Sequence, residues 1–466
     1  MEANDDASFI LANFVASIKY EDIPGEVVEN TKKSILDSLG CILAASTLSD
    51  TSKKIVDLVK EAGGREESTI LAFGGKVPCW MAAFANGAMG HLLDYDDTHY
   101  KTMLHPTMAT LPSALAASER LGGVRGKELI TAVTVANDLI CRMGLAISGG
   151  AGGEKFGIWN IRQTLGYFGA AAASARILGL NEEHIASALG IVSQMSAGTV
   201  QVSIGGGCTF RGIYPAPAGF AGVLSAVMAQ KGIIGPGDSL EGKAGFYRAY
   251  FDGLYDRRAI VANIGRSFET MDVGFKIWPC AGFLQSYIDA TLSLVRQHNI
   301  KPEEITNITV VVNDTTRRLF EPSEVRYKPS NSLDAKWSIP WAVACAISKG
   351  NVSLYDFSAE GIRDSSALEI ARKVSPKHDP ALNIIKGLTP GIVEINTRNK
   401  VYQTRVDYPY GHPRNPANRD DLIKKFIDCA SYSVKPIKKE NISAAVDMIS
   451  KLDELEDTRR IAELLG

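Results

Sequence analysis

The sequence has no block of basic residues and almost no net charge. Its 50 lysines and arginines are balanced by 52 aspartates and glutamates, which gives a formal net charge of −2. A surface that binds nucleic acid is expected to be strongly basic, because it must neutralise phosphates. We therefore expect no nucleic-acid partner.

Long apolar runs and paired cysteines are also missing. The N-terminal segment MEANDDASF is acidic and unlike a secretory signal, and no window approaches the roughly 20 uninterrupted apolar residues of a membrane span. Only seven cysteines occur and none form CxxC, which argues against a disulfide framework or a zinc ribbon. We expect a cytoplasmic protein with reduced thiols and no membrane association.

The glycine-rich segments do not match phosphate-binding loops. SGGAGGEKFG and SIGGGCTFRG fit neither GxGxxG nor GxxxxGK[ST], and neither follows a predicted strand. They are better interpreted as loops around a pocket, where backbone amides can still bind carboxylates.

The first part of the chain has helical periodicity. Apolar residues recur at i, i+3, i+4 and i+7, and residues 167–178 and 216–228 consist almost entirely of Ala, Gly, Ser and short apolar side chains. Side chains this small let helix axes approach closely, as in the buried layer of a helical bundle. Further helices are predicted at 26–45, 53–62, 107–121 and 127–145.

After about residue 267 the pattern changes to alternating strands and helices. Strands are predicted at 308–313, 392–396 and 401–406, and helices at 284–298, 333–348, 366–374, 419–430 and 441–464. The order predicts a mainly α protein, with a large all-helical domain and a smaller inserted α+β lid domain. The expected boundaries are 1–268 for the helical domain, 269–412 for the lid, and 413–466 for C-terminal helices that complete the helical domain.

Residues 91–106, HLLDYDDTHYKTMLHP, concentrate three aspartates, three histidines, a lysine and two threonines between apolar segments. On a helix, His91, Asp94 and Thr98 would share one face. The helix is expected to end near Thr98, before a loop that leads to His105 and the following proline.

Three interpretations of this segment are open. It could be a solvated helix end, a metal site that uses Asp94, Asp97, His99 and His105, or an acid–base site in which a carboxylate orients an imidazole. No HExxH or facial-triad spacing supports a metal. We therefore predict an acid–base site with no metal.

Two cationic residues lie in distinctive surroundings. Arg211 follows a glycine run in CTFRGIYPAPAG, and Lys276 lies among apolar residues in DVGFKIWPCAG. An exposed cation would only be solvated, whereas burial would lower the pKa of Lys276 and make it a proton carrier. Cys280 is expected to be buried packing rather than a nucleophile.

Taken together, these segments resemble the MmgE/PrpD family. The resemblance rests on KKSILDSLG, FANGAMGHLLDYDDTH, LGYFGAAAASARILGL, DVGFKIWPCAG and YGHPRNP, which are spread over nearly the whole chain. The known activities of the family include 2-methylcitrate dehydratase, cis-aconitate decarboxylase and iminodisuccinate epimerase. The resemblance implies a mostly helical domain with an α+β lid, a homodimer, and neither a metal nor an organic cofactor.

The resemblance also implies roles for individual residues. Asp94, Thr98 and His105 match the family's active-site segment, and Lys276 matches its hinge lysine. We expect Lys276 and His105 to exchange protons with a di- or tricarboxylic acid bound between bundle and lid. Asp94 would orient His105, Thr98 would hydrogen-bond the substrate, and Arg211 would bind a carboxylate.

Several positions depart from the family pattern. Tyr214 replaces a histidine, Asn160 stands where the family often has a histidine, and Ala281 or Gln285 replaces another. Arg162 is a further candidate for binding a carboxylate. The missing histidines disfavour cis-aconitate decarboxylation. We predict a lyase of the dehydratase type, with an epimerase, a decarboxylase and a catalytically lapsed scaffold as alternatives.

Overall fold

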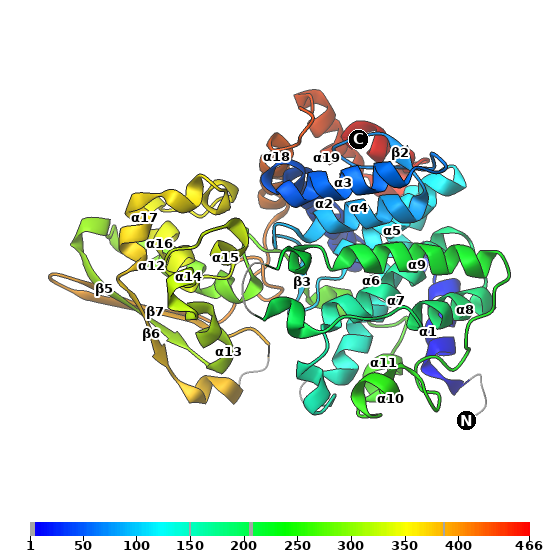
Figure 1. The fold of residues 1–466 in the computed structure, drawn as a ribbon, viewed down its shortest axis with the longest axis horizontal. Coiled ribbons are helices and arrows are strands. Elements are labelled where there is room, and N and C mark those ends of the chain that lie inside the picture. The colour runs from blue at the N-terminus through cyan, green and yellow to red at the C-terminus, as the bar shows by residue number, and fades with distance from the viewer. Residues whose placement is uncertain (1–4, 149–150, 205–207, 385–386) are drawn as a thin grey trace. The chain divides into compact units, whose positions relative to one another are not determined.

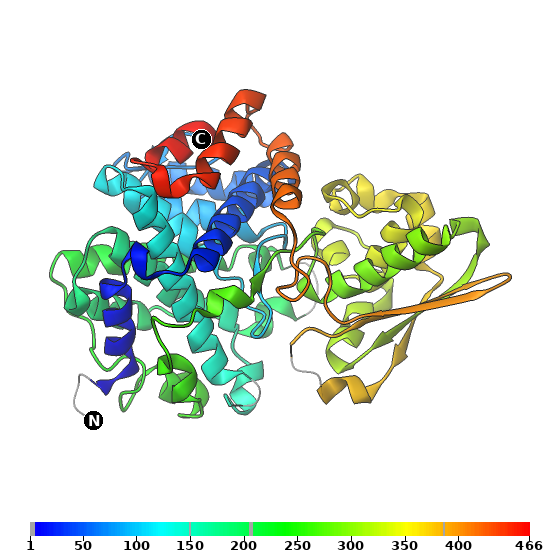
Figure 2. The same cartoon turned by 180° about the vertical axis from the view of Figure 1, so that it is seen from behind.

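The computed structural model describes residues 5–148, 151–204, 208–384 and 387–466 (Figures 1 and 2). The chain divides into two compact units. The first comprises Met1–Ile204, Phe210–Val273 and Asn418–Gly466, and the second comprises Gly274–Ala417 together with residues 208–209. The predicted fold class, mainly α with an α+β part, is confirmed.

The first unit is a bundle of helices. They are α1 (Ala7–Ser17), α2 (Gly25–Leu48), α3 (Asp50–Ala62), α4 (Cys79–His91), α5 (Thr107–Leu121), α6 (Gly126–Ile147), α7 (Ile161–Ile177), α8 (Glu182–Ser193), α9 (Pro215–Gln230), α10 (Phe246–Phe251), α11 (Arg257–Val261), α18 (Arg419–Ser431), α19 (Lys439–Ser450) and α20 (Arg459–Leu465). Helix α7 lies at the centre and packs against α5, α6, α8 and α9 (Figure 1). The C-terminal helices join the same unit, where α18 packs on α2 (Figure 2).

Short strands connect some of these helices. They are β1 (Ser68–Thr69), β2 (Lys76–Val77), β3 (Thr98–His99) and β4 (Val273–Gly274), and β1 pairs antiparallel with β2. Strand β3 lies in the connection between α4 and α5, which carries the candidate site.

Among the described residues, one helix is long and apolar enough to cross a membrane by length and composition. It is α6, and 94% of its apolar window is buried inside the protein.

Small residues bring the central helices close together, as the sequence predicts. A Cβ atom built on Gly222 of α9 would lie 2.6 Å from the backbone nitrogen of Ala171 in α7. By contrast, a Cβ on Gly166 of α7 would lie 3.4 Å from the Cβ of Ala218, an ordinary contact. The glycine at 222 is therefore required by the approach of the two backbones.

The second unit combines a four-stranded sheet with helices. The strands are β5 (Ile305–Val312), β6 (Val374–His378), β7 (Gly391–Thr397) and β8 (Val401–Val406), in the order β6-β5-β7-β8. Strand β6 is parallel to β5, whereas β7 is antiparallel to both β5 and β8. Helix α12 (Gln285–His298) packs on β7, β8 and α16 (Ile339–Lys349). The remaining helices are α13 (Asp314–Arg317), α14 (Ser323–Arg326), α15 (Ser332–Lys336) and α17 (Ser365–Ala371).

Three details of the predicted elements are wrong. Strand β6 was not predicted, because it is an edge strand with four exposed residues and a proline, so its sequence lacks alternation. The helix predicted at 333–348 is interrupted at Trp337 and Ser338, where Ser338 begins α16 by accepting a hydrogen bond from the backbone N–H of Trp341. The helix predicted at 441–464 is likewise divided into α19 and α20.

Replacing Gly222 with alanine is expected to destabilise the bundle. The new methyl group would press on the backbone of α7, and overpacking of this kind costs about 1–3 kcal/mol. The free energy of unfolding, measured by chemical denaturation, should fall by that amount in G222A. The matched variant G166A should be as stable as the wild type or more stable by up to about 1 kcal/mol, because alanine favours helix. Equal stability of the two variants would contradict the close approach of α7 and α9.

Candidate active site

The connection between α4 and α5 is not the helix that the sequence predicts. Helix α4 ends at His91, and Asp94 has a φ of 51°. Asp94 therefore adopts a left-handed conformation, which aspartate tolerates better than most non-glycine residues. Because Thr98 belongs to β3, the expected shared helix face of His91, Asp94 and Thr98 does not exist. The prediction of a helix to Thr98 is wrong.

The loop turns its polar side chains into the protein. Those of Asp94, Asp96, Asp97, Thr98, His99 and His105 are all buried. Buried polar groups are costly unless they are hydrogen-bonded or paired. The interpretation as a solvated helix end is therefore wrong.

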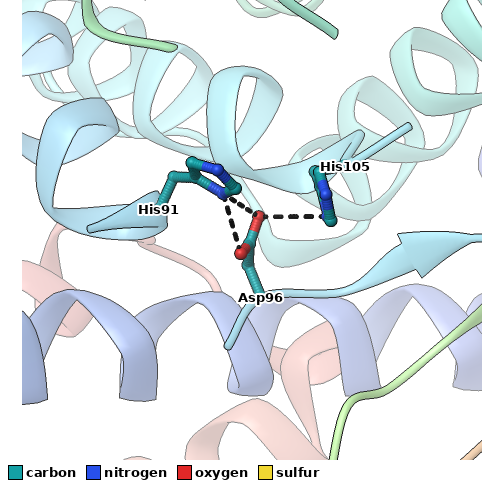
Figure 3. Close-up of side chains that lie close together, drawn as sticks. All are labelled: His91, Asp96 and His105. Atoms are coloured by element: carbon teal, nitrogen blue, oxygen red, sulfur yellow. Dashed lines mark hydrogen bonds and ion pairs between the residues drawn. The ribbon is translucent and has the colours of Figure 1, made fainter. Parts of the chain in front are cut away.

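Asp96 joins two histidines (Figure 3). Its carboxylate oxygens lie 2.9 and 3.0 Å from Nδ1 of His91, and Oδ2 lies 3.6 Å from Nδ1 of His105. The two imidazole rings are 5.0 Å apart between centroids. One residue comes from the end of α4, one from the loop and one from just before α5, so the chain reversal creates this group.

The hydrogen bonds indicate which nitrogen of His105 carries a proton. Its Nδ1 lies 2.7 Å from the backbone carbonyl oxygen of Asp97, which can only accept. Nδ1 is therefore the donor, and the lone pair of the neutral ring resides on Nε2. The hydroxyl of Thr98, 3.3 Å from the same Nδ1, helps to fix the ring. This arrangement gives an imidazole that can exchange a proton through Nε2.

Asp97 attaches the loop to the start of α5. Its carboxylate accepts a 2.5 Å hydrogen bond from the hydroxyl of Thr107 and a longer one from the Thr107 backbone N–H. Asn137 of α6 in turn donates to the hydroxyl of Thr107. Burial raises the pKa of Asp97 to about 7, although the bonds from Thr107 oppose the shift. Asp97 thus has a structural contact with the first turn of α5.

Tyr214 lies against His91. Its ring centroid is 4.6 Å from that of His91, and its hydroxyl has no hydrogen-bond partner among the residues that the structure describes. Burial raises the pKa of Tyr214 well above its usual value; Arg162 and Arg211 oppose this shift, while Asp96 and Asp94 add to it. The hydroxyl is therefore a neutral, buried donor in a field shared by two cations and two carboxylates.

Three further residues of the first unit, Arg162, Asn160 and Arg211, are predicted to bind substrate. Arg162 donates from Nε to the backbone carbonyl of Met103, at 2.8 Å, so part of its guanidinium supports the loop. Asn160 is buried at the N-cap of α7, and Arg211 is half-buried. Binding of substrate by these three residues stays a prediction.

Lys276 belongs to the second unit, where its side chain is fully buried. Gln285, which with Ala281 is one of two candidate positions for a lost histidine, accepts from the backbone N–H groups of Ile277 and Trp278 and donates to the carbonyl of Trp278. It therefore stabilises the segment that follows Lys276. Proton exchange by Lys276 opposite His105 stays a prediction, and Cys280 is buried as expected.

Among the residues that the structure describes, two groups could hold a metal ion. The ligand atoms of His91, Asp96 and His105 lie within 4.8 Å of one another, and imidazole and carboxylate are suitable ligands for zinc. A metal bound through the two Nδ1 atoms would, however, displace their hydrogen bonds. The second group is His99, Glu269 and Asp272, in which both carboxylates already pair with Lys101 at 3.4 and 2.5 Å.

Known proteins match the chain over almost its full length. Residues 10–257 match the MmgE/PrpD N-terminal domain, and residues 278–451 match the MmgE/PrpD C-terminal domain. The chain belongs to the MmgE/PrpD family. Similar relatives include cis-aconitate decarboxylases of Aspergillus terreus, 24% identical over 98% of this chain and 95% of the relative, and of Mus musculus, 25% identical over 97% and 92%. The cis-aconitate decarboxylase of Homo sapiens is 24% identical over 97% of this chain and 93% of its own length.

The site of this MmgE/PrpD chain contains two residues, Asp96 and His91, to which the sequence analysis assigns no role in the chemistry. The orientation of His105 was assigned to Asp94, whereas the structure brings Asp96 next to both His105 and His91. The sequence signal for the pair is the separation of five residues between His91 and Asp96. Residues five apart do not share a helix face, but they can contact each other across a loop. The role of Asp94 in orienting His105 stays a prediction.

The stability of the protein is expected to depend on pH through Asp97. The folded pKa of about 7 lies above the value of about 3.9 in an unfolded chain, so this stabilising contribution is complete below about pH 4 and is lost as pH rises to about 7. Between pH 5 and pH 8, the free energy of unfolding of the wild type should fall by about 2–3 kcal/mol relative to D97N. D57N, at an exposed aspartate, should follow the wild type. Parallel curves for the wild type and D97N would contradict the raised pKa.

Proposed function

We propose that this MmgE/PrpD protein is a lyase that acts on a small di- or tricarboxylic acid. The shared chemical step is proton transfer to or from a carbon next to a carboxylate. The observation that carries the proposal is the buried group His91–Asp96–His105, in which Nδ1 of His105 also donates to the Asp97 carbonyl and the ring of Tyr214 lies against that of His91.

His105 is the proposed acid–base residue. A neutral imidazole with Nδ1 fixed by an acceptor can take a proton on Nε2, and the imidazolium that forms is stabilised by the nearby carboxylate of Asp96. Asp96 would remain ionised and would hold the ring in place. Thr98 fixes the same ring through its hydroxyl, and Lys276 is the proposed second proton carrier.

Tyr214 is the proposed donor to an oxygen of the substrate. An unsatisfied buried hydroxyl costs about 1–3 kcal/mol, and a carboxylate or enolate oxygen would satisfy it. Stabilising charge that develops on such an oxygen is a large contribution to catalysis. The positive charges of Arg162 and Arg211 affect the same hydroxyl, so they favour an anionic substrate near Tyr214.

The names of the relatives and the residues expected from the resemblance favour different reactions within this proposal. The relatives are named cis-aconitate decarboxylases, which favours loss of carbon dioxide. Asn160 and Tyr214 replace histidines expected from the family, which favours loss of water with His105 and Lys276 as the two proton carriers. An epimerase would use the same two groups to return a proton to the opposite face. Dehydration is the reaction that we place first.

Proton NMR in heavy water tests the proposal directly. The purified protein is incubated with citrate-like, aconitate-like and aspartate-like acids. We expect deuterium to enter next to a carboxylate of one acid, with a new alkene signal if water is lost. Loss of carbon dioxide identifies a decarboxylase, and exchange without loss of either identifies an epimerase. No reaction and no rise in melting temperature with any acid would contradict the enzymatic proposal and favour a lapsed scaffold.

The two buried histidines of the loop allow a matched test of His105. Replacing His105 with glutamine should lower turnover of the reacting acid by about 10²–10⁴-fold, because a positioned acid or base contributes that much. H99Q changes a histidine that is equally buried and bonded to Thr102 but lies outside the Asp96 group. It should retain turnover within a few-fold of the wild type. Equal losses in both variants would show that loop disruption, not proton transfer, is responsible.

A further inference from the structure

A buried lysine from the C-terminal helices contacts the loop of the candidate site. Lys425 lies on α18 and is only 7% exposed. Its ammonium lies 2.6 Å from Oδ1 of Asp37, which belongs to α2. Buried lysines are rare unless they are paired, so this ion pair explains why the charge is tolerated between α18 and α2.

The same ammonium is attached to the loop in two further ways. Nζ of Lys425 donates a 2.7 Å hydrogen bond to the backbone carbonyl of Tyr95, and it lies 3.6 Å from the centroid of the Tyr95 ring. A cation over an aromatic face is attracted by the ring, more strongly where water is excluded. Both the backbone and the side chain of Tyr95 are therefore held by one charge.

Tyr95 lies between Asp94 and Asp96 in the loop. Asp94 precedes it in a left-handed conformation, with a φ of 51°, and Asp96 follows it with its carboxylate against His91 and His105. An unfavourable backbone conformation persists only where the surroundings hold it. An anchor at Tyr95 limits the movement of both neighbours.

The charge on Lys425 is retained in its buried position. Burial lowers the pKa of Lys425, but the charge and the hydrogen bond of the Asp37 carboxylate oppose this effect, and the pKa is raised overall. The ammonium is consequently protonated at neutral pH and can donate to the Tyr95 carbonyl.

We propose that Lys425 is a positioning residue for the active-site loop. The C-terminal helix α18 supplies an ammonium that holds Tyr95, and through Tyr95 it places the Asp96 carboxylate between His91 and His105. Lys425 is assigned no contact with substrate. The catalytic consequence rests on the proposed function, whereas the ordering of the loop does not.

The test separates loop positioning from simple stabilisation of the core. K425M alone would leave Asp37 buried without its ion-pair partner, so it is compared with the double variant K425M/D37L, which removes both charges. The readouts are melting temperature, hydrogen–deuterium exchange of residues 92–106, and turnover of the acid identified by NMR. The double variant should regain most of the melting temperature lost in K425M. Its loop amides should still exchange at least 10-fold faster than in the wild type, and kcat should be at least 10-fold lower with KM changed less than 3-fold.

Two other variants serve as controls. D37N keeps the ammonium and its bond to Tyr95, so it should lose melting temperature without faster exchange in the loop. K32M removes another buried lysine of the first unit, which pairs with Glu29 and Asp453 and donates to the carbonyl of Ser450. It should lower the melting temperature and leave exchange of residues 92–106 unchanged.

The outcomes distinguish this inference from the proposed function. Wild-type exchange and kcat in K425M/D37L, or equally fast loop exchange in K32M or D37N, would overturn the positioning role. Faster loop exchange in the double variant of a protein that transforms none of the acids would support the positioning role and overturn only the proposed function.

Discussion

The site depends on a carboxylate that is buried between two imidazoles. An isolated carboxylate in a protein interior is very costly, and it is tolerated only where donors or positive charges surround it. His91 supplies a close donor to Asp96, and His105 lies on the other side. Each ring in turn needs an acceptor that fixes its tautomer, which is Asp96 for His91 and the backbone carbonyl of Asp97 for His105. His91, Asp96 and His105 must therefore be held close together, and the helices of the first unit hold the loop that carries them.

The surrounding bundle provides that support by rigid packing. Helix α4 ends at His91, and α5 begins at Thr107, which is held to Asp97 by two hydrogen bonds. The loop is thus attached at both ends to helices within a closely packed layer. Around that layer, glycines such as Gly222 permit backbone contact between α9 and α7. Closely packed interiors do not adjust continuously, so they can hold side chains at fixed distances.

The sequence predicted most helices because their signals are local. Periodicity and small residues located α5, α7 and α9 well, and β-branched runs located three strands of the larger sheet. Strand β6 was missed because an edge strand needs no buried face. The loop of the site was recognised from its density of polar residues, but its internal geometry was not. Helical spacing favoured Asp94, whereas the end of α4 at His91 and the left-handed turn at Asp94 bring Asp96 inward. Neither the end of α4 nor the left-handed residue is marked by a glycine, which is the usual sequence signal for both.

Two positions of the first unit at which the resemblance implies a departure from the MmgE/PrpD pattern have a common location in the fold. Asn160 is the N-cap of α7 and Tyr214 is the N-cap of α9. Neither side chain caps its own helix through a hydrogen bond, so neither is needed there for helix stability. A residue at such a position can change its chemistry while the packed faces of the helix stay the same. Buried helix faces therefore preserve the family fold, and the starts of α7 and α9 are places where the reaction can diverge. Such a separation would let nearly full-length similarity identify the family while a few side chains decide the reaction.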